Sequence, residues 1–257
     1  MLDGQPSSLR DDKSCEKWGF RPAKESPACV LQCVSVPNGK IATVRAFVFD
    51  LDGTLIDSKM DLVNSVNAML RETGRAELPP GLIASYVGHG APQLMASTLG
   101  PASTEAHRKE ALAIFLKHYS QQKLNETRPY PGVVDGVRAL ADSLVPMAVL
   151  TNKPTQLSIE ILEGLGLMKF FQAIYGGDSF PAKKPDPAGV LAVLQELGVP
   201  PKVSAMVGDS DVDIQTARNA AMVAIGVTYG FGQHDRAKCP ADVYVDTLIA
   251  LSPLVRR

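Results

Sequence analysis

The sequence predicts an α/β protein, a doubly wound and mostly parallel sheet into which a helical domain is inserted. Two observations lead to this prediction. From residue 44 onward, short strands that are apolar along their length alternate with helical stretches, which is typical of βαβ units. One interval, residues 58–122, breaks the alternation and has a helical pattern throughout, so it is too long to be a simple crossover.

Six runs are the predicted strands. Most of them are apolar at nearly every position rather than at alternate positions, as expected for strands buried on both faces of a parallel sheet. They are VRAFVFD (44–50), PMAVLT (146–151), AIYGGD (173–178), SAMVGD (204–209), MVAIGV (222–227) and ADVYVD (241–246).

Four helical stretches lie between these strands, at 133–144, 155–166, 187–198 and 211–221. Right-handed crossovers through such helices bring the carboxyl ends of parallel strands to one edge of the sheet. We therefore expect a ligand site at that edge.

The helical interval contains four pieces, 58–74, 79–88, 91–100 and 103–122. Their apolar positions recur every three or four residues, as in helices packed antiparallel. We expect a separate helical domain, residues 58–129, that sits over the strand ends of a core domain. That core domain would consist of residues 41–57 and 130–257.

Residues 1–40 show neither helical nor strand periodicity over most of their length, and we expect an extension that can be disordered. Asn38-Gly39 separates two β-rich runs, which predicts a hairpin or, equally, an irregular lead-in to the first strand.

Composition excludes several classes of function. Lys and Arg total 26 against 27 for Asp and Glu, so no net charge favours nucleic acid or an anionic membrane. No apolar run reaches the roughly 18 residues of a membrane span. The four cysteines match no zinc or CxxC spacing. We expect a cytoplasmic protein with unpaired thiols, and the sequence leaves its oligomeric state open.

Several predicted strands end in polar residues. Asp50 ends the first strand with Asp52 two positions later, TNK (151–153) ends the second, and GDSDVD (208–213) ends the fourth. Carboxylates held together at one edge repel each other by several kcal/mol per close pair at an effective dielectric of roughly 20, so a cation is expected among them. Oxygen ligands without histidine or thiolate favour magnesium, and lysine and threonine nearby favour a phosphate oxyanion.

Two acids two residues apart suit phosphoryl transfer. Asp50, at the end of a rigid strand, can attack phosphorus and form an aspartyl-phosphate. Asp52 can protonate the leaving oxygen and then take a proton from the water that cleaves the intermediate. Gly53 permits the sharp turn that follows.

Taken together, DLDGTLIDS (50–58), TNK (151–153), KKPDP (183–187) and GDSDVD (208–213) resemble the four motifs of the haloacid dehalogenase superfamily, in order and over residues 44–253. The resemblance implies a Rossmann-like core, a type 1 cap at the helical insertion and a Mg²⁺-dependent phosphatase. It implies Asp50 and Asp52 as catalytic residues, Thr151, Asn152 and Lys184 as phosphate-binding residues, and Asp50, the Asp52 carbonyl, Asp209 and Asp213 as metal ligands. Lys183 does not match the motif and is interpreted as a solvated neighbour.

Within the expected cap, YVGHGAPQLM (86–95) resembles the glycine-containing segment of phosphoglycolate phosphatases. Gly88 and Gly90 leave backbone N–H groups accessible beside a helix N-terminus, which would bind a carboxylate. Gly88, His89 and Gly90 are therefore candidate substrate contacts, although a plain turn between helices explains the same residues, and His89 could equally be a surface histidine. NAAM (219–222) departs from the family pattern, in which a glycine commonly precedes the methionine.

We therefore predict a phosphomonoester hydrolase for a small-molecule phosphate ester, with 2-phosphoglycolate as the leading substrate. A sugar-phosphate mutase of the β-phosphoglucomutase type, a pyrophosphatase and a sugar-phosphate phosphatase stay open. A non-catalytic binding module is the least favoured alternative, because it would be free to lose Asp50 or Lys184.

Overall fold

The computed structural model describes residues 43–255. The predicted extension at 1–40 and most of the proposed hairpin lie outside this range. Among the described residues, no helix combines the length and the apolar composition of a membrane span.

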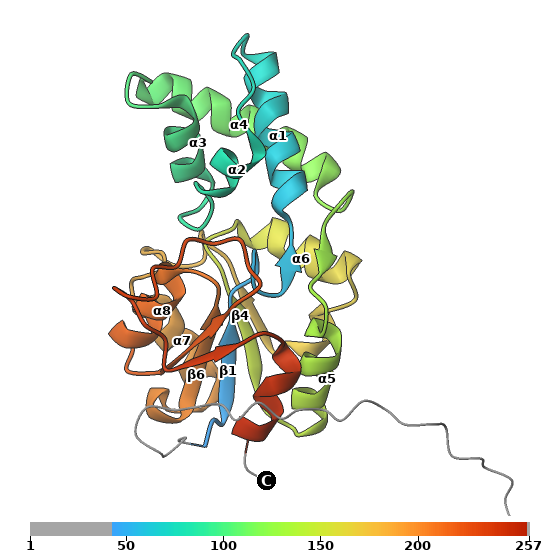
Figure 1. The fold of residues 1–257 in the computed structure, drawn as a ribbon, viewed down its shortest axis with the longest axis vertical. Coiled ribbons are helices and arrows are strands. Elements are labelled where there is room, and N and C mark those ends of the chain that lie inside the picture. Colours follow the sequence, from blue (N-terminus) through green and yellow to red (C-terminus); the bar gives the residue numbers. More distant parts are fainter. Residues whose placement is uncertain (1–42, 256–257) are drawn as a thin grey trace, which may run out of the picture. The chain divides into compact units, whose positions relative to one another are not determined.

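Six strands form one parallel sheet in the order β5-β4-β1-β6-β7-β8 (Figure 1). Each neighbouring pair is parallel, so all six predicted strands and the α/β fold class are confirmed. The strands are β1 (Ala46–Phe49), β4 (Met147–Leu150), β5 (Ala173–Tyr175), β6 (Ser204–Gly208), β7 (Val223–Val227) and β8 (Val243–Val245).

Helices cover both faces of this sheet. Phe47 and Phe49 of β1 contact one apolar cluster, which includes residues of α5, α6 and η3. Ala46 and Val48, which point the other way, contact the cluster formed with α7 and α8, because successive side chains of a strand alternate between faces. The elements are α5 (Val133–Asp142), α6 (Thr155–Gly164), η1 (Met168–Phe170), α7 (Ala188–Leu197), η2 (Pro201–Val203), α8 (Asp211–Asn219) and η3 (Leu248–Leu254).

The long interval after β1 is helical, as the sequence predicts. Buried apolar residues recur every three or four residues along α1 and every four residues along α4. This spacing keeps them on one side of each helix. On α4, Phe115 stacks on Tyr119 with ring centroids 5.6 Å apart. The helices are α1 (Lys59–Glu72), α2 (Pro80–Ala84), α3 (Ala91–Leu99) and α4 (Glu105–Gln122), and they lie beyond the carboxyl end of β1 in Figure 1.

A short antiparallel pair, β2 (Ile56–Asp57) and β3 (Arg128–Pro129), joins the two passages of the chain between these helices and the sheet. Nearby, the buried carboxylate of Asp61 accepts hydrogen bonds from the backbone N–H groups of Glu126 and Thr127. The pair lies at the predicted limits of the helical domain, and its two-residue strands are too short to show a period. Whether residues 58–129 form an independent domain stays a prediction.

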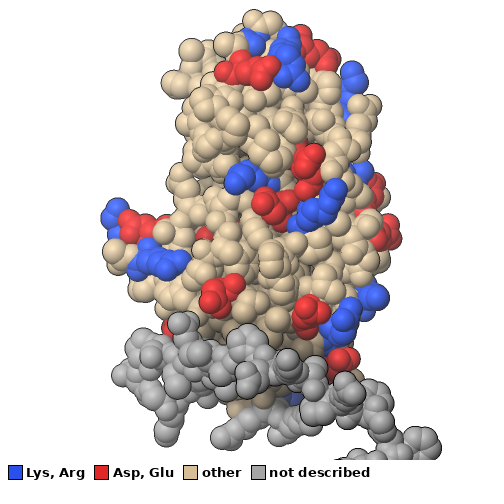
Figure 2. Space-filling view, turned by 45° about the vertical axis from the view of Figure 1, so that its right-hand side comes forward, with Lys and Arg blue, Asp and Glu red and all other residues tan. Residues whose placement is uncertain are grey.

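Figure 2 shows acidic and basic side chains interspersed on one face of the molecule, with neither sign forming a continuous patch there. This distribution matches the near-zero net charge of the sequence. Cys239, the cysteine among the described residues, forms no disulfide.

Candidate active site

The candidate site lies at the carboxyl end of β1, the strand between β4 and β6. Phe49 pairs in register with Val149 of β4 and with Val207 of β6. The residues that follow these strands therefore emerge at the same height. This register brings Asp50, Thr151 and Asp209 to one place, as the sequence predicts.

Asp50, Asp209 and Asp213 form a buried cluster whose nearest carboxylate oxygens all lie within 4.8 Å of one another. The buried ammonium of Lys184 lies 2.7 Å from Asp50 Oδ1 and 2.6 Å from Asp213 Oδ1. Three carboxylates against one ammonium leave two negative charges without a partner in the cluster. These oxygen ligands could therefore hold a metal ion, and a divalent cation would balance the charge.

Asp213 and Lys184 are held in place by neighbouring backbone. Asp213 Oδ2 accepts from the backbone N–H and the hydroxyl of Ser210 at the start of α8. The backbone N–H of Lys184 donates to Asn152 Oδ1 at 3.0 Å. Asp50 has fewer partners: its Oδ1 contacts the Lys184 ammonium at 2.7 Å and lies beside two further buried acids. A buried carboxylate that shares one ammonium with other acids fits a metal-binding role.

Burial and like charge disfavour ionisation in this cluster. Burial raises the pKa of Asp50 to about 6, with Lys184 lowering it and Asp213 raising it further. Burial also raises the pKa of Asp209 well above its usual range, and Asp213 and Asp50 add to that effect. A cation bound here would favour the ionised carboxylates.

Glycines allow the chain to close around Asp209. Gly53 has a φ of +83°, and a methyl group at this position would clash with the Asp209 carboxylate. The backbone N–H of Gly232 donates to Asp209 Oδ2 at 2.6 Å. The predicted turn at Gly53 is confirmed, and the close approach to Asp209 is a second reason for glycine there.

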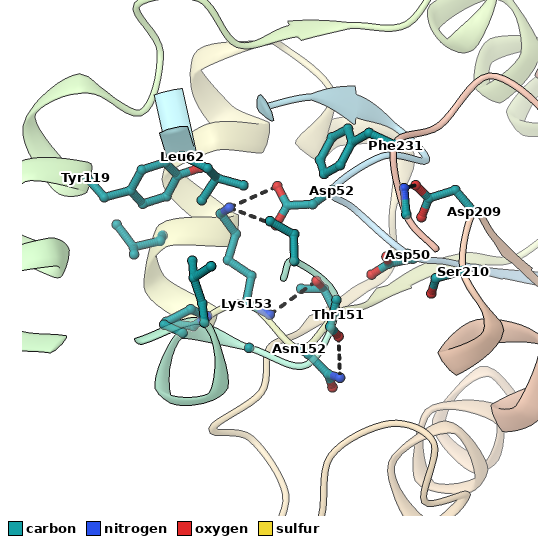
Figure 3. A pocket seen from close by; sticks show the side chains of 18 of the residues that line it. Asp50, Asp52, Leu62, Tyr119, Thr151, Asn152, Lys153, Asp209, Ser210 and Phe231 are labelled. Carbon is teal, nitrogen blue, oxygen red and sulfur yellow. Dashed lines mark hydrogen bonds and ion pairs between the residues drawn. The ribbon is translucent and has the colours of Figure 1, made fainter. Parts of the chain in front are cut away.

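Asp52 has a different set of partners. Lys153 Nζ lies 2.9 Å from Asp52 Oδ1 and 2.8 Å from Oδ2, and Ser58 donates its hydroxyl to Oδ1. The Lys153 ammonium also lies 4.5 Å from the ring centroid of Tyr119 on α4. The carboxylate of Asp52 therefore belongs to a separate buried ion pair, outside the metal-type cluster (Figure 3).

Lys153 is a site residue that the sequence does not predict. The TNK motif (151–153) predicts roles for Thr151 and Asn152 only. Burial lowers the pKa of Lys153, but Asp52 and Tyr119 outweigh this and raise it overall. The residue is thus a permanent cation beside the predicted acid/base. A lysine three residues past the end of an apolar strand was the available signal.

Asn152 and Thr151, the two predicted phosphate-binding residues after β4, differ in whether their side chains are free to hydrogen-bond a ligand. The side chain of Asn152 donates to the carbonyls of Gly88 and Lys184 and accepts from the Lys184 N–H. It is therefore engaged in joining protein segments. Thr151 is buried and lines the pocket, and its Oγ1 accepts from the Lys153 N–H, which leaves its hydroxyl proton available to a ligand.

The candidate substrate segment, Gly88 to Gly90, closes against the sheet edge. Gly90 has a φ of +86°, and a Cβ there would lie 2.9 Å from the carbonyl oxygen of Asn152 and 3.0 Å from Lys183 Nζ. Gly88 and Gly90 line the pocket, whereas His89 is exposed and is not among the lining residues. Lys183, interpreted as a solvated neighbour, is half-buried beside this segment.

A pocket that is partly open to solvent lies between the strand ends and the helices above them (Figure 3). Asp50, Asp52, Thr151 and Asp209 lie at the sheet edge. The other side is apolar and comes from α1, α3, α4, α6 and the segment before α3. It includes Leu62, Val87, Leu94, Phe115, Leu116 and Leu157.

Comparisons with known proteins agree with this geometry. A family model for haloacid dehalogenase-like hydrolases matches residues 47–227. A phosphoglycolate phosphatase from Agrobacterium fabrum is 37% identical over 209 residues, covering 80% of this chain and 90% of that protein. Another from Pseudomonas putida is 42% identical over 218 residues, with coverages of 81% and 79%. A crystal structure described as a predicted phosphoglycolate phosphatase from Haemophilus somnus matches with a TM-score of 0.78 and 30% identity, covering 82% of this chain and 98% of that one.

The acid cluster predicts that a divalent cation stabilises the fold. Adding magnesium to chelator-treated protein should raise the melting temperature, because only the folded chain assembles the three carboxylates. Asp209→Asn should lose most of this shift. Asp211→Asn, a change in the same chain segment but outside the cluster, should keep it. Equal shifts in the wild type and Asp209→Asn, measured by differential scanning calorimetry, would contradict the assignment.

Asp50 also predicts a pH dependence. Its pKa rises from 3.8 to about 6 on folding, so between these values the folded state binds more protons and its stability falls as pH rises. Asn at this position does not titrate. In chelator, the melting temperature of Asp50→Asn minus that of wild type should therefore increase from pH 4 to pH 7. The same difference for the exposed Asp135→Asn should stay flat, and a flat Asp50→Asn difference would refute the shifted pKa.

Proposed function

Because the chain belongs to the haloacid dehalogenase-like hydrolase family, we propose that it is a magnesium-dependent phosphatase that hydrolyses 2-phosphoglycolate through an aspartyl-phosphate. The observation that carries the proposal is the separation of two neighbouring acids into different charge environments. Asp50 lies in the cluster with Lys184, and Asp52 is paired with Lys153.

Asp50 is the proposed nucleophile. It ends β1, the strand between β4 and β6, so its position is fixed by two parallel neighbours. Its carboxylate attacks phosphorus, the bond to the leaving oxygen breaks, and the phosphoryl group is held as an aspartyl-phosphate. The Lys184 ammonium and the Thr151 hydroxyl would bind the phosphoryl oxygens, since both are buried donors beside Asp50.

Asp52 is the proposed general acid and base. Its carboxylic acid gives a proton to the leaving oxygen, and the resulting carboxylate takes one from the water that attacks the aspartyl-phosphate. Lys153 and Ser58 fix the orientation of this carboxyl group. Because Asp52 lies outside the acid cluster, it can transfer the proton while Asp50 is bonded to phosphorus.

Magnesium fits the oxygen ligands of Asp50, Asp209 and Asp213. We propose that these carboxylates hold it, together with the backbone carbonyl of Asp52. When bound, the ion neutralises charge that develops on the phosphoryl oxygens. The excess of two negative charges in the cluster supports a divalent ion over a monovalent one.

The helices between β2 and β3 would act as a cap over the pocket. They supply much of its apolar side, and closure over a small ester excludes water and strengthens the charge interactions inside. The hydrogen bond from Asn152 to the Gly88 carbonyl supports contact between this cap and the sheet edge.

The choice of 2-phosphoglycolate rests on the names of the relatives and on the pocket lining. A sugar phosphate carries several hydroxyl groups that need polar partners, and the cap side of the pocket consists mostly of leucine, valine and phenylalanine side chains. The same lining argues against a sugar-phosphate mutase. A pyrophosphatase would need several cations for a second phosphoryl group, and Lys153 is the one lysine or arginine among the lining residues of the described chain.

A substrate panel tests the proposal. Phosphate release should be fastest from 2-phosphoglycolate among a set that includes sugar phosphates, pyrophosphate and an aryl phosphate, and a chelator should abolish it. Asp50→Asn, prepared in parallel, should retain the fold and show no turnover, which excludes a contaminating phosphatase. Faster phosphate release from another ester would support the phosphatase reaction but show that 2-phosphoglycolate is not the preferred substrate. Isomerisation of a sugar 1-phosphate would favour the mutase.

Asp52→Asn should bind phosphate but lower kcat by about 10²–10⁴, the usual contribution of a general acid or base. The matched change Asp57→Asn, at a neighbouring acid that does not line the pocket, should leave kcat near the wild-type value. Turnover of Asp52→Asn at the wild-type rate, measured under saturating 2-phosphoglycolate, would show that another group transfers the proton.

A further inference from the structure

Two buried polar groups next to the predicted acid/base have binding capacity that the hydrolytic steps do not use. They are the ammonium of Lys153 and the hydroxyl of Tyr119, both from residues that line the pocket. The neighbouring lining from the helices is apolar, including Leu62, Leu94 and Phe115. Any polar part of a ligand on this side must therefore meet these two groups or a backbone group.

Tyr119 has no hydrogen-bond partner for its hydroxyl, although the side chain is 99% buried, with a relative exposure of 1%. Buried hydroxyl groups in proteins usually have a partner. Burial raises the pKa of this hydroxyl, so it stays protonated and can donate. In Figure 3 the hydroxyl end of Tyr119 points toward the region of Lys153.

Lys153 also has spare capacity. An ammonium group carries three N–H donors and no acceptor. Two of its short contacts go to the two oxygens of Asp52, and the ammonium also lies 4.5 Å from the centroid of the Tyr119 ring. Because Lys153 and Tyr119 are neighbours, a donor of the ammonium and the Tyr119 hydroxyl can contact the same ligand.

We propose that Lys153 and Tyr119 together bind a carboxylate carried by the leaving group of the phosphate ester. This assignment rests on the proposed function, because it places the phosphoryl group at Asp50. Figure 3 shows Asp50, Asp52, Lys153 and Tyr119 in sequence across the pocket. A leaving group whose oxygen meets Asp52 therefore extends toward Lys153 and Tyr119.

A carboxylate matches these two donors chemically. It accepts hydrogen bonds on both oxygens, and such bonds are stronger when donor and acceptor are charged. The two donors lie in an apolar surrounding, which suits one carboxylate on a short carbon chain, and the Lys153 charge is shared between that carboxylate and Asp52. Lys153 and Tyr119 thus determine specificity. The backbone N–H groups of Gly88 to Gly90 stay predicted substrate contacts, and the Gly88 carbonyl accepts a hydrogen bond from Asn152.

Binding of matched phosphonates tests this assignment without requiring turnover. The probes are 3-phosphonopropionate, in which a methylene replaces the ester oxygen of 2-phosphoglycolate, and its neutral carboxamide. Isothermal titration of the full chain with magnesium should show tighter binding of the carboxylate by about 10-fold or more, the range for a hydrogen bond to a charged group. Tyr119→Phe should reduce this preference several-fold, and Lys153→Gln should abolish it.

Tyr175→Phe is the matched control, because its hydroxyl bonds to Glu196 outside the pocket, and it should keep the wild-type preference. Melting temperatures of all variants check that they fold. Equal binding of the two probes by wild type, no binding of the carboxylate probe, or an unchanged preference in Tyr119→Phe would overturn the assignment. If Tyr119→Phe loses the preference for the carboxylate probe while wild type fails to hydrolyse 2-phosphoglycolate, the carboxylate site is supported and the proposed substrate is wrong.

Discussion

Buried negative charge at the end of β1 is the constraint on which the rest of the site depends. Four carboxylates, those of Asp50, Asp52, Asp209 and Asp213, lie at or near this edge, and all are buried except that of Asp52, which is 12% exposed. Two lysines from different loops pair with different members of this group of carboxylates. Lys184 neutralises part of one group and Lys153 pairs with Asp52, so the protein can fold with these acids in place.

This division has a chemical consequence. A nucleophile and a proton donor must differ in protonation during the reaction, although Asp50 and Asp52 are identical side chains two residues apart. Their surroundings differ, because Asp50 lies in a metal-type cluster and Asp52 contacts a lysine and a serine. Gly53, with a φ of +83°, allows the chain to turn directly after Asp52.

The fold was largely predictable because its signals are local. Short, mostly apolar runs identified all six sheet strands, and acids directly after those runs identified Asp50 and Asp209. The pairing of Lys153 with Asp52 was not predictable, since it depends on how loops after β1 and β4 approach one another. Tyr119 was missed for a related reason: on α4 it has the spacing of an ordinary core residue, and its contact with Lys153 is visible only in three dimensions.

A covalent intermediate at Asp50 is the central requirement of the proposed mechanism. Acid quenching of the magnesium-loaded protein during turnover of 2-phosphoglycolate, followed by peptide mass spectrometry, would locate any phosphoryl group. We expect one phosphoryl group on Asp50, accumulating to a higher level in Asp52→Asn if cleavage of the intermediate is slowed more than its formation. A phosphoryl group on another residue, or steady turnover with no covalent phosphoryl enzyme, would contradict this mechanism.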